Sequence, residues 1–511
     1  MGHPAHTAQL AAKASAAQGS YERHRPETTV LYQVVEQHWP DFLERAEDAG
    51  GLPRFVVREI EAYLRCGMLQ HGCLHLVCED CGFDRLVAFS CKRRGFCPSC
   101  LGRRMSDAAV HLVERVLPEV PVRHWVCSLP WRLRTLCGYD RRLCAAVMRA
   151  FIRELHRSLR FRAKREFGLP SVKASFPGTV TVMQRFDSAL RLNVHWHTLA
   201  LDGVYVRKRS GALIFLALPE PSYEEVLEVA ERTANRVAKV LKELPRSLDG
   251  ADDEQGQGDL AVDPESALGA CYGAASQGLE LFGERAGKRA LRLVDPALAQ
   301  ATEPVAEVGG INVHAKRSVD GRDRAQLERM CRYLVRPPIA QDRLERLPDG
   351  RVRYTMKRVW RDGTHAIVLS PETLMARLCA MVPPPRMHLI RFHGVLASHA
   401  SRRREVVPAA PKPLATPEQL SLFGEPNDTE PSDTEPSRKS WSWMVRHVFL
   451  EDVSRCPKCS GNMRWVEVAT TPEAIARLVA AHDRASPEPP STRRPAMRAP
   501  PSPQMVLPFV A

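Results

Sequence analysis

Hydrophobic positions along the chain recur with two different periods, and the changes of period predict the elements. A helical period, broken by Pro and Gly, runs through residues 28–70. It returns from 107 to 168, with an interruption near Pro118–Pro130, and again over Tyr223–Leu244. A further helix is expected to end at Arg336, before two consecutive prolines. These segments predict helices that each bury one apolar face.

Period-two alternation, which is typical of half-buried strands, occupies the segments between these helices. It appears in TVTVMQRF, RLNVHWHTLAL, VYVRK and ALIFLAL, with turns expected at Asp187–Ser188 and Asp202–Gly203. A later hairpin is expected from RVRYTMKRVW and THAIVLS, joined at Asp362–Gly363.

The same changes in pattern divide the chain into expected parts. They are, in order, a loose tail (1–27), a cysteine-dense part (28–106), a large part that combines helices and strands (107–400) with an acidic insertion at about 246–268, a linker rich in Pro, Ser and Thr (401–440), a small module with one Cys-x-x-Cys pair (441–485) and a Pro-rich tail (486–511).

Composition and charge narrow the class of protein. Lys and Arg number 73 against 59 Asp and Glu, a net charge of +14, which favours a polyanionic partner. No run approaches the ~18 apolar residues of a membrane span, and the first twenty residues lack the apolar core of a secretory signal. We therefore exclude a membrane protein and expect a cytoplasmic one, associated with the bacterial nucleoid. The fifteen cysteines cluster, which indicates metal binding rather than disulfides.

Four cysteines have the spacing of a zinc site. Cys78-x-x-Cys81 is followed, after fifteen residues, by Cys97-x-x-Cys100. Two such pairs can close a tetrahedral thiolate shell, which leaves no open position for water, so we expect a structural zinc there. Four neighbours lie close enough to replace one of these ligands: Cys91, Cys73, His71 and His75.

A further pair, Cys456 and Cys459, has no partner pair downstream. It is interpreted as a degenerate remnant, or as half of a site completed by His447 or His482.

Two groups of basic residues indicate contact with nucleic acid. Between Arg132 and Arg165 there are eleven basic and two acidic residues, and those on one helix face include Arg149, Arg153 and Arg157. The second group surrounds the zinc pairs and consists of Arg93, Arg94, Arg103 and Arg104. The plainer interpretation of the first group is a solvated helix face. For the second, it is charge balance for the thiolates.

Two segments carry candidate catalytic chemistry. On the expected strand Leu190–Leu201, period two places His195 and His197 on one face and Trp196 on the other, so the two imidazoles could share a metal ion. Gln184, on the preceding strand, shares that face if the residue numbers of directly paired positions on the two strands add up to an odd number. On the expected helix before Pro337, Tyr333 lies on the polar face beside Arg329 and Arg336, whose charges would favour a phenolate.

The ordered set of motifs resembles a known family of mobile-element enzymes. The motifs are FSCKRRGFCPSC, LNVHWHTLALDGVY, LERMCRYLVRPPIA, the runs PPPR and RFHG between residues 383 and 394, and CPKCSGNMRW. They resemble transposases of the insertion-sequence ninety-one family, which are similar to rolling-circle initiators and relaxases of the HUH class, where U is a bulky hydrophobic residue. The resemblance covers residues 55 to 470.

The resemblance implies a fold and a mechanism. The fold is α+β: a ferredoxin-like nuclease domain, an antiparallel sheet with helices on one face, preceded by a small zinc-binding domain. Matched residue by residue, His195 and His197 are the metal histidines, with Gln184 as the third ligand, and Tyr333 is the nucleophile that nicks single-stranded DNA at the ends of the element, with Mg²⁺ or Mn²⁺ as cofactor. Founding members carry two tyrosines four residues apart; here Arg329 takes the earlier position, as in a single-tyrosine branch.

Two other functions remain compatible with the sequence. One is a plasmid replication initiator or relaxase of the same chemical class, although no Walker-type nucleotide-binding motif indicates a helicase. The other is a non-catalytic zinc protein that only binds DNA. Oligomeric state and the DNA ends recognised are not predicted.

Overall fold

The computed structural model describes residues 25–243, 266–299, 305–408 and 455–485. The expected acidic insertion, the linker and the terminal Pro-rich tail lie almost wholly outside these residues. Within the described part of the chain, no helix is both long and apolar enough to cross a membrane.

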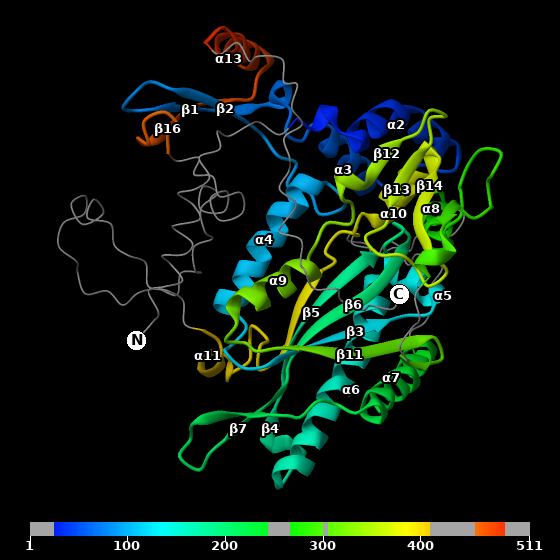
Figure 1. Ribbon diagram of the computed structural model, residues 1–511, viewed down its shortest axis with the longest axis vertical. Coiled ribbons are helices and arrows are strands. Elements are labelled where there is room, and N and C mark those ends of the chain that lie inside the picture. The colour runs from blue at the N-terminus through cyan, green and yellow to red at the C-terminus, as the bar shows by residue number, and fades with distance from the viewer. Residues whose placement is uncertain (1–24, 244–265, 300–304, 409–454, 486–511) are drawn as a thin grey trace, which may run out of the picture.

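A six-stranded antiparallel sheet forms the centre of the molecule. Its order is β10 (Ala306–Val308), β11 (Ile311–Val319), β3 (Val122–Ser128), β6 (Leu192–Leu201), β5 (Gly178–Phe186) and β15 (Ile390–Gly394). Two long helices, α6 (Arg141–Phe167) and α7 (Tyr223–Glu243), lie together on one face (Figure 1).

Along the chain, the core of this layer runs β3–α6–β5–β6–α7–β11. In the sheet, these four strands lie in the order β11, β3, β6, β5, so the fourth strand of the unit is next to the first. This is a β-α-β-β-α-β unit of ferredoxin-like type. The predicted α+β class and antiparallel sheet are confirmed.

Strand β6 separates the two cores because its side chains alternate between the faces. Val194 and Trp196 are fully buried against α6 and belong to the larger core. Leu199 and Leu201 point the other way, into a second core with residues of α4 (Pro98–Arg115) and α9 (Arg324–Leu334). Helices therefore cover both faces of the sheet, not only the face predicted.

Local signals explain the ends of α6. The Asp140 carboxylate accepts a hydrogen bond from the Leu143 backbone N–H at 2.8 Å, which caps the helix start. Gly168 ends the helix in the left-handed region, with φ of 60°, where a side chain would be strained. Between them, apolar residues at helical spacing, such as Val147, Phe151 and Leu155, face the sheet.

The remaining elements extend these layers. The larger core also includes helices α2 (Val30–Asp48), α3 (Arg54–Leu64), α5 (Trp131–Tyr139), α8 (Ala267–Gln277) and α10 (Pro371–Met381), while α11 (Arg403–Val406) follows β15. One small sheet consists of β12 (Leu344–Arg346), β13 (Val352–Thr355), β14 (Thr364–Leu369) and β9 (Leu291–Val294). Another consists of β4 (Ser175–Phe176), β7 (Gly203–Arg207) and β8 (Leu213–Ala217). The predicted hairpin at Asp362–Gly363 is the β13–β14 pair. Because α2 packs against α10, the boundary predicted at residue 106 is not a break in packing.

A separate small sheet joins the two ends of the described chain. It consists of β2 (Asp84–Ala88), β1 (Cys73–Cys78) and β16 (Met463–Ala469), with α13 (Pro472–Ala485) packed against it. It projects from the main body beside α4 (Figure 1) and has its own small core. The predicted separate C-terminal module is thus wrong: residues 455–485 complete the module that begins near residue 73.

The sheet core gives the first testable prediction. Trp196→Ala should lower the free energy of unfolding by about 3–5 kcal/mol, because it leaves a large cavity between the sheet and α6. Trp196→Phe should cost less, because the indole N–H makes no hydrogen bond within the described residues. Denaturant unfolding followed by circular dichroism measures both. Trp131→Ala, at a half-exposed position, is the control, and an equally small effect of Trp196→Ala would contradict this packing.

Candidate active site and metal centres

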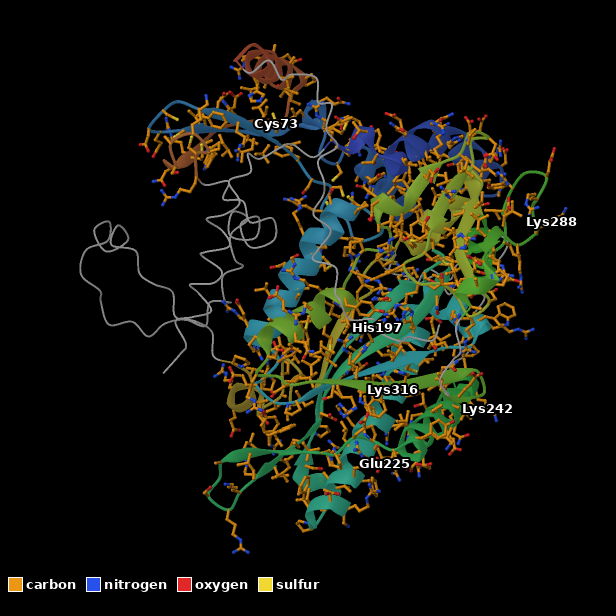
Figure 2. All side chains as sticks on the ribbon, in the orientation of Figure 1. Cys73, His197, Glu225, Lys242, Lys288 and Lys316 are labelled. Carbon is orange, nitrogen blue, oxygen red and sulfur yellow. The ribbon has the colours of Figure 1, made fainter. Side chains whose placement is uncertain are left out.

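Two histidines converge on the sheet face that α9 covers. His195 Nε2 and His197 Nε2 lie 3.1 Å apart at the centre of β6, and Figure 2 places His197 in the middle of the molecule. Two nitrogens about 2.1 Å from one ion stand about 3 Å apart in a cis arrangement, so this separation suits two ligands of one metal.

The Nδ1 atoms of both imidazole rings form hydrogen bonds with other groups of the protein. His195 Nδ1 lies 2.9 Å from the Asn193 carbonyl oxygen. A carbonyl only accepts, so Nδ1 carries the proton and leaves the Nε2 lone pair for a ligand. His197 Nδ1 lies 2.9 Å from His124 Nε2, on β3. His124 thus orients His197 from behind, as outer partners of metal histidines do.

Sequence patterns did not identify His124, because its strand lies in the segment predicted as an interruption between helices. A local signal existed. The segment VRHWVCS repeats the alternation of LNVHWHT, with a histidine next to a buried tryptophan. In the structure, Trp125 is buried on the α6 side and His124 on the other.

Gln184 lies directly opposite His195 in the β5–β6 pair, so paired residues sum to an odd number and the predicted shared face is formed. Its Nε2 donates to the Leu334 carbonyl at 2.7 Å and to that of Tyr333 at 3.4 Å. These bonds satisfy carbonyls at the C-terminus of α9 and tie the helix to the sheet. The Oε1 atom is buried without a hydrogen-bond partner within the described residues, which is costly unless a ligand occupies it.

Tyr333 projects from α9 toward these histidines. Its ring meets that of His197 edge to face, with centroids 5.9 Å apart. The Arg336 guanidinium lies 4.4 Å from the ring centroid of Tyr333, and Lys357 Nζ lies 5.9 Å from it. Burial raises the pKa of the phenol, but the charge and hydrogen bond of Arg336, with the charges of Arg358 and Lys357, lower its pKa overall. The surroundings of Tyr333 therefore make its phenol more acidic than a free tyrosine.

Lys357 and Arg358 were also missed. They precede the turn of the β13–β14 hairpin, which was predicted, but sequence gives no reason for that hairpin to lie beside α9. Arg329, in contrast, is exposed one turn before Tyr333.

The histidines are neutral near pH 7. Burial, with the charges of Arg336 and Arg134, lowers the pKa of His195 to about 4 despite its hydrogen bond to Asn193. Burial and the two neighbouring histidines hold the pKa of His197 well below its usual range. Neutral imidazoles keep the lone pairs that a metal needs.

Eight cysteines form two groups of four, whereas one group of four was predicted. Cys66, Cys91, Cys97 and Cys100 make one, and Cys78, Cys81, Cys456 and Cys459 make the other. The predicted Cys78–Cys81–Cys97–Cys100 site is therefore wrong. The β1–β2 hairpin carries Cys78 and Cys81 to its far end, whereas Cys97 and Cys100 begin α4 at its base. The remnant interpretation of Cys456 and Cys459 is wrong as well. His482 lies 3.4 Å from an Asp84 carboxylate oxygen and is not in either group.

The arginines near the cysteines differ in their surroundings. Arg93 and Arg104 are exposed. Arg94 donates to the Met387 carbonyl at 3.0 Å, and Arg103 lies 3.8 Å from Cys100 Sγ, where it balances thiolate charge. The two exposed residues are the better candidates for phosphate contact.

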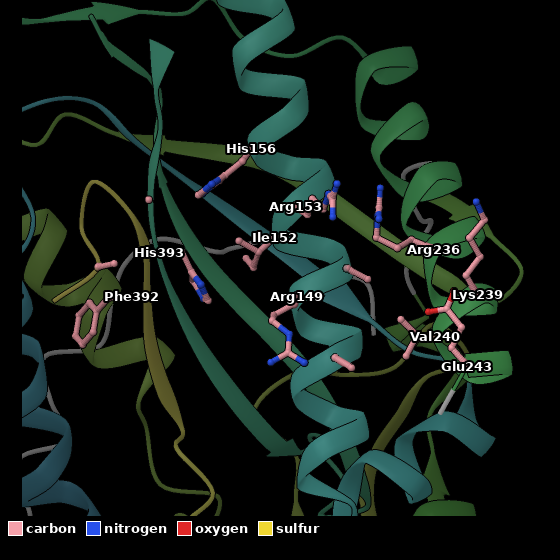
Figure 3. Close-up of a pocket in the computed structure, with 14 residues that line it drawn as sticks. Arg149, Ile152, Arg153, His156, Arg236, Lys239, Val240, Glu243, Phe392 and His393 are labelled. Atoms are coloured by element: carbon pink, nitrogen blue, oxygen red, sulfur yellow. The ribbon is translucent and has the colours of Figure 1, made fainter. Parts of the chain in front are cut away.

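The predicted basic face of α6, called the α6 stripe, carries Arg149, Arg153 and Arg157. Helix α6 lies on the face of the sheet away from Tyr333. Arg149, Arg153 and Arg157 are exposed, and none forms an ion pair with a described residue. Arg149 and Arg153 line a groove of about 810 Å³ together with Arg236 and Lys239 of α7 and with Phe392 and His393 of β15 (Figure 3). Among the described residues, Glu243 supplies the one carboxylate that lines it.

Comparisons with known proteins give two matches in sequence families. Residues 34–129 match a family described as transposase zinc-binding domain, and residues 178–404 match one described as putative transposase. Together they span more than half of the chain. The transposase for insertion sequence element IS801 of Pseudomonas savastanoi pv. phaseolicola is 32% identical over 118 residues, which is 23% of this chain and 27% of that protein. No solved structure matches.

The surroundings of Tyr333 give the second prediction. Arg336→Gln should raise the pKa of Tyr333, because it removes both a charge and a hydrogen bond that favour the phenolate. Tyrosinate absorbance followed against pH measures this, with Tyr333→Phe identifying the signal. Arg329→Gln, at an exposed position, should leave the titration unchanged. An unchanged pKa in Arg336→Gln would show that this arginine does not act on the phenol.

Proposed function

The chain belongs to the insertion-sequence ninety-one family of transposases, with their N-terminal zinc-binding domain, and from this we propose that it nicks and rejoins single-stranded DNA through Tyr333. The matched relative covers about a quarter of each chain, so the activity of the whole protein is part of the proposal. One observation carries it: the Tyr333 ring meets the ring of His197 edge to face, and the Arg336 guanidinium lies 4.4 Å from the Tyr333 ring centroid.

The reaction follows from these groups. The Tyr333 phenol loses its proton and its oxygen attacks the phosphorus in line. The bond from phosphorus to the 3′ oxygen breaks, and the departing 3′ oxygen takes up one proton, so no net proton is gained or lost. The product is a 5′-phosphotyrosine and a free 3′ hydroxyl, so the reverse attack by a 3′ hydroxyl rejoins DNA without a nucleotide cofactor. The charges of Arg336, Lys357 and Arg358 lower the pKa of the phenol, which eases loss of its proton before attack, and these groups offer cationic partners to the phosphate oxygens.

Three groups fit a divalent metal. They are His195 Nε2, His197 Nε2 and the orphaned Oε1 of Gln184. A bound metal would act as a Lewis acid on the scissile phosphate. Two nitrogen ligands and one amide oxygen, with no carboxylate, suit Mn²⁺ better than Mg²⁺, which prefers oxygen ligands. We therefore propose Mn²⁺ as the more effective cofactor of the two.

One tyrosine per chain forms the covalent link. Arg329 stands four residues before Tyr333, one helical turn away, where a second nucleophile would share the same face. Each chain then holds one strand end at a time. A second simultaneous link requires a second chain or a sequential reaction.

The basic groove of α6 and α7 lies across the sheet from Tyr333, so we propose that it binds the DNA flanking the scissile strand. Arg149, Arg153 and Lys239 would neutralise phosphates without reading sequence, whereas Arg236 is paired with Glu154 at 2.6 Å. A replication initiator or relaxase would use the same chemistry, and DNA from the ends of the element is the substrate that distinguishes a transposase.

Loss of the nucleophile gives the third prediction. Tyr333→Phe should abolish the covalent adduct with labelled single-stranded DNA and leave DNA binding and folding nearly intact, because it removes one oxygen. Denaturing gel electrophoresis detects the adduct, and a binding assay on the same samples detects retention.

Matched variants separate the possible causes. Tyr223→Phe, at an exposed position, should retain the full adduct. His195→Ala with His197→Ala should lose it while Tyr333 remains, and Mn²⁺ should support more adduct than Mg²⁺ in the wild type. Undiminished nicking by Tyr333→Phe without any adduct would indicate a water nucleophile and overturn the proposal.

The α6 stripe gives the fourth prediction. Replacing Arg149, Arg153 and Arg157 by Gln should flatten the slope of log affinity against log salt by about 2 for single strands, because about 0.7 is lost per phosphate contact. The control replaces three arginines that are already paired with aspartates: Arg292, Arg322 and Arg351. Equal changes in both triple variants would show that only net charge matters and that this face of α6 is not a binding site.

A further inference from the structure

Two Cys-x-x-Cys turns from opposite ends of the described chain have the same backbone geometry. In the first, Gly82 N–H donates to the Cys78 carbonyl and Cys78 N–H to the Phe83 carbonyl, at 3.1 and 2.8 Å. In the second, Ser460 N–H donates to the Cys456 carbonyl and Cys456 N–H to the Gly461 carbonyl, both at 2.8 Å. The residue after the second cysteine has positive φ in both turns, 69° at Gly82 and 61° at Ser460. The two turns are copies of one metal-binding knuckle.

The knuckles face each other closely enough to share an ion. Cys78 Sγ lies 3.4 Å from Cys459 Sγ, and Cys81 Sγ lies 3.5 Å from Cys456 Sγ. These separations far exceed a disulfide bond of about 2.05 Å. They approach the edge of about 3.8 Å expected for four sulfurs at 2.3 Å from a tetrahedral zinc.

Backbone groups support thiolates in the second knuckle. Lys458 N–H points to Cys456 Sγ and Gly461 N–H to Cys459 Sγ, each at 3.4 Å. The knuckles also touch directly. Glu79 N–H donates to the Asn462 carbonyl at 3.1 Å, and a Cβ on Gly461 would stand 2.0 Å from an Asp80 carboxylate oxygen. Gly461 therefore allows the close approach.

Apolar packing alone holds this part of the chain weakly. The core beneath β16 has five buried residues, of which Ala469, Ile475 and Leu478 come from the C-terminal segment. On β16, Trp465 is 66% exposed, and Val466 and Val468 are also exposed. A core this small needs an additional stabilising link, such as a bound metal ion.

We propose that Cys78, Cys81, Cys456 and Cys459 bind a second structural zinc, which fastens residues 455–485 to the β1–β2 hairpin. Cys456 and Cys459 lie outside residues 34–129, the part that matches the zinc-binding domain. The other group, Cys66, Cys91, Cys97 and Cys100, joins α3, the end of β2 and the start of α4 at the base of the module. One zinc holds the base, and the second closes the far end with ligands 375 residues apart.

The first test is the zinc content of the full-length protein, measured by elemental analysis after purification under reducing conditions. We expect two zinc ions per chain in the wild type and one in the double variant Cys456→Ser, Cys459→Ser. Lys458→Ala, between the two ligands, is the matched control and should keep two. Two zinc ions in the double variant, or one in the wild type, would overturn the proposal.

A second measurement covers the case in which the double variant does not fold. Thiol alkylation of the wild type, mapped by mass spectrometry during titration with a chelator, groups the cysteines that share an ion. Cys78, Cys81, Cys456 and Cys459 should be protected at first and become reactive together, at lower chelator than the buried group, because Cys81 and Cys459 are exposed. Reaction of Cys456 and Cys459 before any chelator, or of Cys78 and Cys81 together with Cys97 and Cys100, would contradict the second site.

Discussion

The alternation of β6 is the constraint on which the arrangement of the site depends. Because successive side chains point to opposite faces, burial of Val194 and Trp196 against α6 forces His195 and His197 toward α9. A slip of one residue would exchange the two sets and bury the imidazoles in the apolar core. The packing energy of the core therefore sets the position of the proposed metal ligands.

The second requirement is that Tyr333 stays in contact with His197, its neighbour among those ligands. Gln184 connects the two parts, because its Nε2 holds the carbonyls at the end of α9 while its strand pairs with that of His195. Helix α9 also packs along α4, whose first turn carries Cys97 and Cys100. A structural zinc at the base of the small module would thus stabilise a helix that supports the nucleophile, although it lies outside the reaction itself.

Sequence patterns predicted which residues share a face of one strand or helix. They did not predict which segments far apart in the chain contact each other. The face shared by His195, His197 and Gln184, and the polar face that carries Tyr333, follow from periods of two and 3.6. The knuckles were recognised from spacing, but spacing cannot say which knuckles meet. The pairing of β1 with β16 decides that, across nearly the whole chain. Lys357 and Arg358 were missed for the same reason, since tertiary packing alone brings their hairpin to the site. His124 is different, because its strand repeats the local alternation of β6.

We propose that the phenol oxygen of Tyr333, whose ring meets that of His197 edge to face, is the atom that forms the covalent bond to DNA. The most direct measurement is peptide mapping by mass spectrometry of the wild-type protein trapped on single-stranded DNA from the ends of its element with Mn²⁺, then digested with nuclease and protease. We predict that the nucleotide remnant is attached to Tyr333. Attachment to another tyrosine, such as Tyr354 or Tyr205, both of which are buried, would contradict the claim.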